Sequence, residues 1–431
     1  DFNPYEIIVT YQLSADGVNV TGPVRELKSG GRKWFRVNPG TDVFTDPCGE
    51  YLPAGTFIFL YVWCNTRIST ATTINGETGQ LSADSANFPR FDAVGGSLNN
   101  LTCGSRFTNN AAIDTSYNST ATGVFTVNAT AGTGPVALIG ECVDEVGNAS
   151  IFWLGDSISQ GSNDIVPMST EAYSGQGVVG RTLAQNWALY NAGLNSTSAV
   201  SWNSYYKVAH RSLNMLYADT LVYWLGTNDF ATGGTFAQVQ AAAIQTWQWS
   251  RKCGVKRIVV PTCLYRYTST DAYQTFENQT AAGGGTFIAN ATAWNDWLLT
   301  GNGPDDVDLV IDVVPLVQDR TQAGKYKLST LLQSGTLAAG STTTVINVNE
   351  TLVTNALMGR SYFQAGDTAQ YRIVSNTTSA ITIATALSGG APAAGTAYKV
   401  LATMTDDGTD PSQYGAKVLA AGINPLLFNY R

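Results

Sequence analysis

The feature that most constrains the fold of this chain is a series of five continuous apolar runs in its middle part, separated by helix-like stretches. The longest such stretch covers residues 235–254, where Gly254 lies just past the predicted helix as a stop signal. Strands that are apolar on both faces need cover on both faces, and strands alternating with helices pair in parallel. We therefore expect an α/β fold with three layers, α/β/α, around a five-stranded parallel sheet. The predicted strands are "SIFWLGDS" (150–157), "WALYNAG" (187–193), "DTLVYWLG" (219–226), "KRIVVPTC" (256–263) and "VDLVIDVVP" (307–315).

The regions before and inside this domain are rich in β-type sequence. Residues 1–148 contain short β-type runs separated by Gly, Pro, Asn and Asp turns, which predicts an all-β sandwich or jelly roll with a carbohydrate-binding or structural role. Residues 331–398 contain no Cys, Trp or His and include a predicted hairpin with its turn near 376–378. We expect them to form a small inserted β module. The α/β domain then comprises residues 149–330 and 399–431.

Charge narrows the class of partner. Charged residues make up only 13% of the chain, the net charge is -8 and the isoelectric point is near 4.7. No basic stripe could release counterions from phosphates, so nucleic acid is excluded and an uncharged glycan is the expected partner. No apolar run reaches the length of about 18 residues that a membrane span needs. Such a composition is typical of β-rich proteins outside cells, so we expect a secreted protein or one on a virion surface.

The six cysteines are unevenly distributed. If the segment between the last two is a strand, its ten residues separate their sulfurs by roughly 33 Å, so these two cannot bond to each other. The other four lie in the first third of the chain and allow three pairings, among which the sequence does not choose. The early cysteines are Cys48, Cys64, Cys103 and Cys142, and the later ones are Cys253 and Cys263.

Two of the predicted strands end in polar turns. The first strand runs directly into Ser157, beside the amino end of the next helix, where backbone N–H groups favour a developing oxyanion. The position therefore suits a nucleophile, although serine also caps helices in such turns. The third strand ends in Asn228 and Asp229. Because ligands bind at the carboxyl ends of parallel strands, both turns should face one crevice.

At these two turns the sequence resembles the SGNH hydrolase superfamily, the GDSL-type esterases and lipases. The resemblance covers residues 150–330 and 399–431 and implies an SGNH-type α/β domain with Ser157 as nucleophile. It also implies that the N–H of Ser157 and the side-chain amide of Asn228 donate to the oxyanion. In the family's second block a glycine supplies a further backbone donor. Here Ser196 stands at the best-aligned place and Gly193 three residues earlier, so both are candidates.

The last block of the family, Asp-x-x-His-Pro, is matched here except for its histidine. Asp407 takes the place of the orienting aspartate, and Asp410 stands where the general base should be. A carboxylate is a far weaker base than imidazole near neutral pH. His210, the only histidine in the chain, is an alternative base or a surface residue. Asp406 adds a third carboxylate to this loop, but the spacing does not match a calcium loop, and we expect neither metal nor cofactor.

Two hypotheses about function follow. The first is a serine esterase that removes O-acetyl groups from a surface polysaccharide, impaired by Asp410 in place of histidine, whether this replacement is natural or engineered. The second is a catalytically inactive glycan-binding, receptor-binding or structural protein of a virion or cell surface. The Thr-rich inserted module is loosely similar to modules of bacteriophage tail proteins, which suggests a virion component that could be a homo-oligomer. A lipase ranks last, because the sequence has no amphipathic lid.

Overall fold

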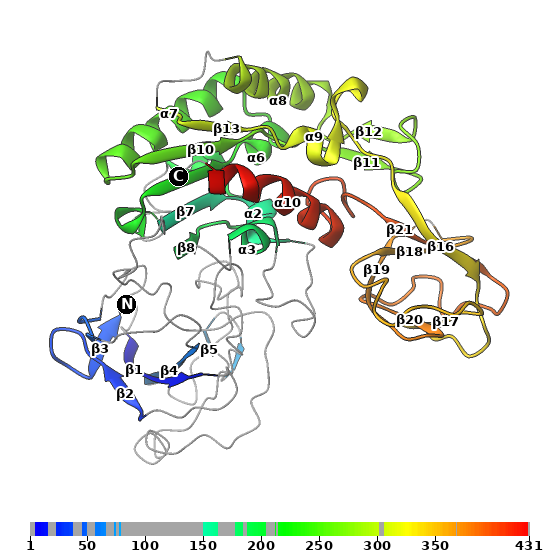
Figure 1. Cartoon of the computed structure of the whole chain (residues 1–431), viewed down its shortest axis with the longest axis horizontal. Coiled ribbons are helices and arrows are strands. Elements are labelled where there is room, and N and C mark those ends of the chain that lie inside the picture. The colour runs from blue at the N-terminus through cyan, green and yellow to red at the C-terminus, as the bar shows by residue number, and fades with distance from the viewer. Residues whose placement is uncertain are drawn as a thin grey trace. The chain divides into compact units, whose positions relative to one another are not determined.

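The computed structural model divides the chain into two compact units, residues 1–93 with 97–140 and residues 94–96 with 141–431 (Figure 1). The structure describes residues 5–15, 23–37, 45–49, 57–65, 73–74, 77–78, 150–162, 177–183, 188–203, 212, 214–300, 306–367 and 369–429.

The first unit contains an antiparallel sheet built on one long strand. Strand β1 (Tyr5–Ser14) pairs with β2 (Arg25–Leu27), β3 (Trp34–Val37) and, along nearly its whole length, β4 (Phe57–Asn65). Two short strands, β5 (Thr73–Ile74) and β6 (Glu77–Thr78), pair with each other. These antiparallel strands agree with the β-rich prediction for this region. The sandwich or jelly-roll arrangement depends on residues that lie outside the described ones.

The second unit is built around a parallel five-stranded sheet, as predicted. Every neighbouring pair in it is parallel, and all five strands coincide with the five apolar runs. The second strand along the chain lies at one edge, and the third pairs with the other side of the first. The strand order therefore reverses between the first and third strands. In open α/β sheets, ligands bind at the carboxyl ends of the strands at this position. The spatial order is β13 (Leu309–Ile311), β10 (Arg257–Pro261), β9 (Thr220–Trp224), β7 (Ser150–Gly155) and β8 (Ala188–Asn191).

Helices cover both faces of this sheet. In Figure 1, α7 (Phe236–Lys252) and α8 (Gly284–Leu299) lie on one side, and α3 (Gly177–Leu183) and α10 (Gln413–Asn429) on the other. Contacts between α7 and α8 and between α3 and α10 complete the outer layers. The three-layer prediction is therefore confirmed. The shorter helical elements are α2 (Ser157–Gln160), α4 (Ala199–Trp202), α6 (Thr227–Ala231), α9 (Val314–Val317), η2 (Asn214–Tyr217) and η3 (Arg320–Gln322).

The core explains why the strands read as continuous apolar runs. Phe152, Trp153 and Leu154 of β7 are all fully buried, and so is Trp247 of α7. Helix α7 begins at a capping box, in which Thr235 accepts a hydrogen bond from the Gln238 N–H. Two short antiparallel pairs lie outside the parallel sheet: β11 (Tyr267–Ser269) with β12 (Gln279–Ala281), and β14 (Gln318–Asp319) with β15 (Lys325–Tyr326).

The inserted β module forms a six-stranded antiparallel sheet with a hydrophobic core of its own, which includes Ile346, Tyr362 and Ile381. The predicted hairpin is confirmed, with its turn closed by a hydrogen bond from the Thr377 N–H to the Ala380 carbonyl. In spatial order the strands are β16 (Thr330–Thr336), β21 (Ala397–Ala402), β18 (Ser361–Gln364), β19 (Tyr371–Asn376), β20 (Ala380–Ile383) and β17 (Val345–Asn347).

Three cysteines of the described part carry free thiols, namely Cys48, Cys253 and Cys263. The last two do not pair, as expected from the strand between them. The pairing of the early cysteines involves Cys103 and Cys142, which lie outside the described residues. In the described residues, no helix has the length and apolar character to cross a membrane.

Candidate active site

Ser157 lies at the carboxyl end of β7, as the first residue of α2, and only 4% of it is exposed. Asp156 caps this helix, since its Oδ1 accepts a hydrogen bond of 3.0 Å from the Ile158 N–H. The first N–H groups of a helix have no acceptor inside it, so the Ser157 N–H is available to an oxyanion. The turn is tight, because a Cβ at Gly155 would overlap the side chain of Ser159.

The carboxyl group of Asp410 faces the hydroxyl of Ser157. Asp410 is 8% exposed, and the Ser157 hydroxyl lies within hydrogen-bonding reach of its carboxylate. Burial raises the pKa of Asp410 to about 6, although Ser157 and the charge of Arg266 oppose the rise. Its Oδ1 is buried and has no hydrogen-bond partner among the described residues. A buried carboxylate with a raised pKa beside a hydroxyl can take up a proton.

Asp407 holds the backbone next to Asp410. The N–H groups of Thr409 and Asp410 donate to its Oδ1 over 2.8 and 2.9 Å. Asp407 is exposed, and its charge contributes to raising the pKa of Asp410. Asp407 therefore fixes the main chain of the candidate base in this structure. In the family pattern, the aspartate at this place is expected to orient the ring of a histidine instead.

Asn228 lies in the same crevice, in the first turn of α6. One hydrogen of its amide is donated to the Thr197 carbonyl over 3.0 Å, and the amide also contacts Oδ2 of Asp156 at 3.5 Å. The guanidinium of Arg266 donates to the Asn228 Oδ1 over 2.6 Å and to the Thr227 hydroxyl over 3.0 Å. A charged donor on the amide oxygen polarises the amide, which makes its N–H groups better donors.

Arg266 is a site residue that the sequence did not reveal. It follows β10 by a few residues and has no motif around it, and its contact with Asn228 spans 38 positions. The signal that could have found it is its place after the fourth predicted strand, whose carboxyl end belongs to the same crevice.

Asp229 holds the start of α4, at the end of the loop that follows β8. Its Oδ2 and Oδ1 accept hydrogen bonds from the N–H groups of Ala199 and Val200 over 2.7 and 3.0 Å, at the start of α4. A buried carboxylate at a helix start satisfies two backbone donors at once. The Gly-x-Asn-Asp turn of β9 therefore fixes both Asn228 and the start of α4.

The two backbone candidates for the oxyanion, Gly193 and Ser196, lie on the loop after β8. The Gly193 N–H donates to Asn191 Oδ1 over 2.8 Å, so this donor is engaged. Ser196 is exposed and has a φ of 63°, in the left-handed region that glycine adopts most easily. Ser196 thus takes a backbone conformation suited to the glycine of the family pattern. The loop is tied to α2 by a hydrogen bond of 2.6 Å from the Asn195 N–H to Gln160 Oε1.

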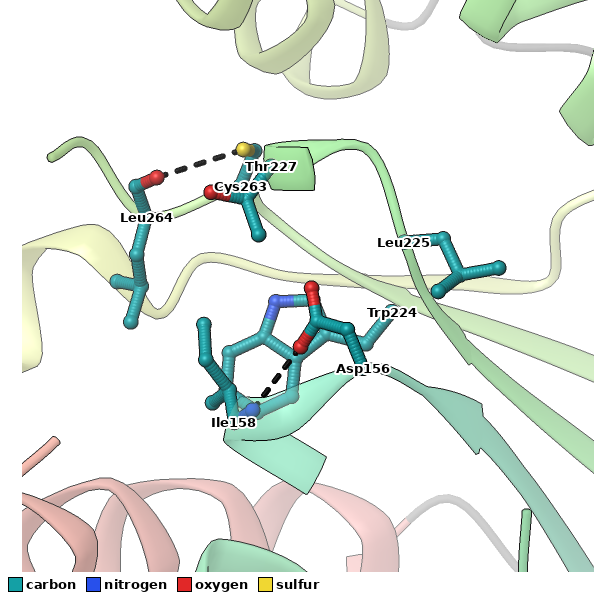
Figure 2. Close-up of a pocket in the computed structure, with 7 residues that line it drawn as sticks. All are labelled: Asp156, Ile158, Trp224, Leu225, Thr227, Cys263 and Leu264. Carbon is teal, nitrogen blue, oxygen red and sulfur yellow. Dashed lines mark hydrogen bonds between the residues drawn. The ribbon is translucent and has the colours of Figure 1, made fainter. Parts of the chain in front are cut away.

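Asp156 and Ile158, the neighbours of Ser157 in the chain, line a small pocket that has no space for a water molecule (Figure 2). Burial raises the pKa of Asp156 there to about 7, with a further contribution from the charge of Asp410. Burial also raises the pKa of Cys263 to about 12, so this thiol stays protonated and is no nucleophile. The lining residues are Asp156, Ile158, Trp224, Leu225, Thr227, Cys263 and Leu264.

The remaining candidates from the sequence are not among the described residues of this crevice. His210 lies outside the described residues. Asp406 is turned toward the inserted β module, where its Oδ1 accepts a hydrogen bond from Ser361 over 3.0 Å. Within the described residues, no group of three or more His, Cys, Asp or Glu side chains could hold a metal ion.

Comparisons with known proteins find likeness only among solved structures. No protein-family model and no curated protein matches the chain. It is similar to a possible lipase from Chitinophaga pinensis (14% identity, 66% of this chain and 99% of that chain, TM-score 0.34). It is also similar to an acetylxylan esterase from Geobacillus stearothermophilus (15%, 39% and 78%, TM-score 0.26). A third similar structure is a member of the lipolytic G-D-S-L family from Veillonella parvula (16%, 38% and 77%, TM-score 0.24). Since these TM-scores are low, the geometry of the site is the basis for the function.

Proposed function

We propose that this chain is an SGNH-type serine esterase, with Ser157 as nucleophile and Asp410 as its general base. The observation that carries the proposal is the Ser157 hydroxyl facing the buried Asp410 carboxylate at the carboxyl end of β7. A nucleophile within reach of a base, on a rigid turn, is the arrangement that acyl transfer requires.

The chemistry needs Asp410 to take up and return a proton twice, once in acylation and once in deacylation. The carboxylate takes the proton of Ser157 as its Oγ bonds to the ester carbonyl carbon, and returns it to the leaving alkoxide, so that an alcohol departs and an acyl-serine forms. It then takes a proton from water, whose oxygen attacks the acyl-serine, and returns the proton to Ser157 as the free acid is released. The Ser157 N–H is the first proposed oxyanion donor. The Asn228 amide is the second, and it would exchange its long 3.5 Å hydrogen bond to Asp156 Oδ2 for one to the oxyanion.

For the substrate we propose the O-acetyl groups of a neutral surface polysaccharide. The acidic, weakly charged chain suits an uncharged glycan better than a polyanion. An extracellular or virion-surface location, a glycan-binding role for the first unit and a homo-oligomeric state belong to the same proposal. Acetate release from acetylated and chemically deacetylated forms of one polysaccharide tests the substrate class directly.

A second candidate function is glycan binding without catalysis. The observation that favours it is the carboxylate at position 410, because an aspartate is a weaker base than the histidine of the family pattern. Hydrolysis of a simple acetate ester by variants of Ser157 and Asp410 separates the two functions.

The experiment is hydrolysis of 4-nitrophenyl acetate by the unchanged chain, Ser157→Ala, Asp410→Asn and Asp410→His. We expect turnover that Ser157→Ala abolishes and that Asp410→Asn lowers on the order of 10²- to 10⁴-fold, the usual worth of a general base. Asp410→His should raise it. Ser162→Ala, which changes a serine just past α2, is the matched control and should turn over normally.

One alternative outcome is that only Asp410→His turns over and that adding Ser157→Ala abolishes this turnover. The unchanged chain would then have an intact esterase site without an effective base. If no variant turns over in a Ser157-dependent way, the esterase proposal is wrong and the binding function takes its place.

A further inference from the structure

The loop that carries Asp410, residues 403–412, is closed on itself as a tight turn. Thr405 and Pro411 form an isolated β-bridge across it. The Thr405 hydroxyl donates to the Asp410 carbonyl over 2.7 Å and accepts from the Gly408 N–H over 2.9 Å. We call these residues the base loop. Because Asp410 lies within this turn, whatever holds the loop also sets the position of its carboxylate.

On one side the α/β domain holds the base loop. The Tyr267 N–H donates to the Gly408 carbonyl over 3.2 Å, and the Tyr326 hydroxyl lies 3.5 Å from the Thr409 carbonyl. These contacts reach the part of the turn between Asp407 and Asp410. The other end, at Asp406, has different partners.

On the other side the inserted β module holds Asp406. Its Oδ1 accepts hydrogen bonds from the Ser361 hydroxyl over 3.0 Å and from the Gln370 amide. Ser361 is 2% exposed, and its hydroxyl also accepts from Gln370 over 2.8 Å. The Thr403 hydroxyl completes the set at 3.2 Å. A largely buried polar network in which donors and acceptor are matched is rigid and specific.

The same edge of the module also touches the residues just after the base loop. The Arg360 guanidinium lies 4.3 Å from the centre of the Tyr414 ring, a cation–π contact. A Cβ at Gly359 would overlap the side chain of Gln413. Gly359, Arg360 and Ser361 therefore contact the chain both inside the base loop and directly after it.

We infer that Ser361 and Gln370 are positioning residues, through which the inserted β module places Asp410 against Ser157. The inference depends on the proposed function and deepens it. The module has its own hydrophobic core, to which Asp406 does not belong. The polar network at Asp406 therefore serves the loop, and the module is part of the catalytic unit in addition to any binding role.

The first test compares Ser361→Ala with Ser388→Ala in the full chain. Ser388 belongs to the same module but bonds to Tyr371 and Asp367, away from the base loop. We expect Ser361→Ala to lower kcat for 4-nitrophenyl acetate on the order of tenfold or more with KM unchanged, because small displacements of reacting groups cost up to about 10²-fold. A loosened loop also hydrates Asp410, so the pH midpoint of activity should fall. Ser388→Ala should change none of these.

The second test changes Asp406, whose carboxylate accepts the hydrogen bonds from the module. Asp406→Asn keeps an oxygen at the Oδ1 position and should retain most of the activity, whereas Asp406→Ala removes the acceptor and should match Ser361→Ala. Equal activity of Asp406→Ala and the unchanged chain would overturn the inference.

A third measurement does not depend on activity. Hydrogen–deuterium exchange of peptides covering the base loop should be faster in Ser361→Ala than in Ser388→Ala. Unchanged exchange, or faster exchange with unchanged kcat, contradicts the positioning role. Faster exchange in a chain that shows no Ser157-dependent turnover at all would instead mean that the proposed function has failed while the anchoring of the loop stands.

Discussion

Asp410 must lose its proton before it can accept one from Ser157, and its burial makes that loss harder. With a pKa of about 6, the carboxylate is largely protonated at pH 5 and ionised at pH 7. We predict that kcat/KM rises about tenfold per pH unit below that pKa and levels off above it. Esterase assays from pH 4.5 to 8.5 check this. A midpoint near 4 would mean that the active carboxylate is hydrated.

Arg266 offers a variant that should move this midpoint. Its charge lowers the pKa of Asp410, so Arg266→Gln should shift the rise in activity to higher pH. Arg257→Gln, a matched change at the start of β10 and thus at the far end of the strand, is the control. Equal midpoints in the two variants would show that Asp410 does not experience the Arg266 charge.

At the scale of elements, the base loop depends on one glycine. Gly408 has a φ of +82°, and a Cβ there would overlap the carbonyl of Tyr267. Gly366, in the turn between β18 and β19, has a φ of +84° but open space around it. Alanine at either position costs about 1–2 kcal/mol for its left-handed backbone. We predict that only Gly408→Ala also displaces the loop and lowers kcat, whereas Gly366→Ala keeps kcat.

Urea unfolding and steady-state kinetics on both variants separate the two effects. If Gly408→Ala costs no more stability than Gly366→Ala and turns over normally, the close contact with Tyr267 is not maintained in solution. Loss of kcat in Gly366→Ala would point instead to a general effect of strain in the module.

At the scale of the whole molecule, buried acids set the dependence of stability on pH. Burial raises the pKa of Asp156 to about 7 and of Asp410 to about 6, from an ordinary value of 3.8, and it also raises the pKa values of Asp229 and Asp406. Between pH 4 and 7 the folded state therefore keeps protons that the unfolded chain has lost. Proton binding stabilises the folded state in this window, so the free energy of unfolding should fall as pH rises through it.

Urea unfolding at pH 5 and pH 8 tests this prediction. We expect lower stability at pH 8, by a few kcal/mol at most, since one pKa unit corresponds to about 1.4 kcal/mol. Asp156→Asn should reduce the difference, because the amide keeps the Oδ1 acceptor for Ile158 and carries no charge. Greater stability of the unchanged chain at pH 8 would contradict it. Activity and stability thus have opposite preferences for pH.

The sequence predicted the parallel sheet because its signal is local. Strands buried on both faces, such as residues 151–154, appear directly as apolar runs, and the turns after them mark the crevice with Ser157 and Asn228. The arrangement around these two side chains depends on long-range contacts. Arg266 meets Asn228 across 38 positions, and Ser361 meets Asp406 across 45. No spacing rule connects such pairs, so the sequence could not predict them.

The protonation behaviour of the site was equally beyond the sequence. An aspartate has the same ordinary pKa in any chain. The pKa of Asp410 is raised by its burial and by the charge of Asp407, which the sequence does not show. The sequence therefore indicated only that a histidine is missing at position 410, whereas the structure shows a buried carboxyl group beside Ser157.

The two ends of the inserted module are hydrogen-bonded neighbours, since Thr330 at the start of β16 pairs with Ala402 at the end of β21. The chain leaves the α/β domain and returns to it at one place, so recombination could exchange the module for another without disturbing the parallel sheet. Such an exchange would not be neutral if the incoming module lacked donors for Asp406. Chimeras that retain Ser361 and Gln370 within a foreign module are therefore the ones in which a new binding specificity should come with a working catalytic site.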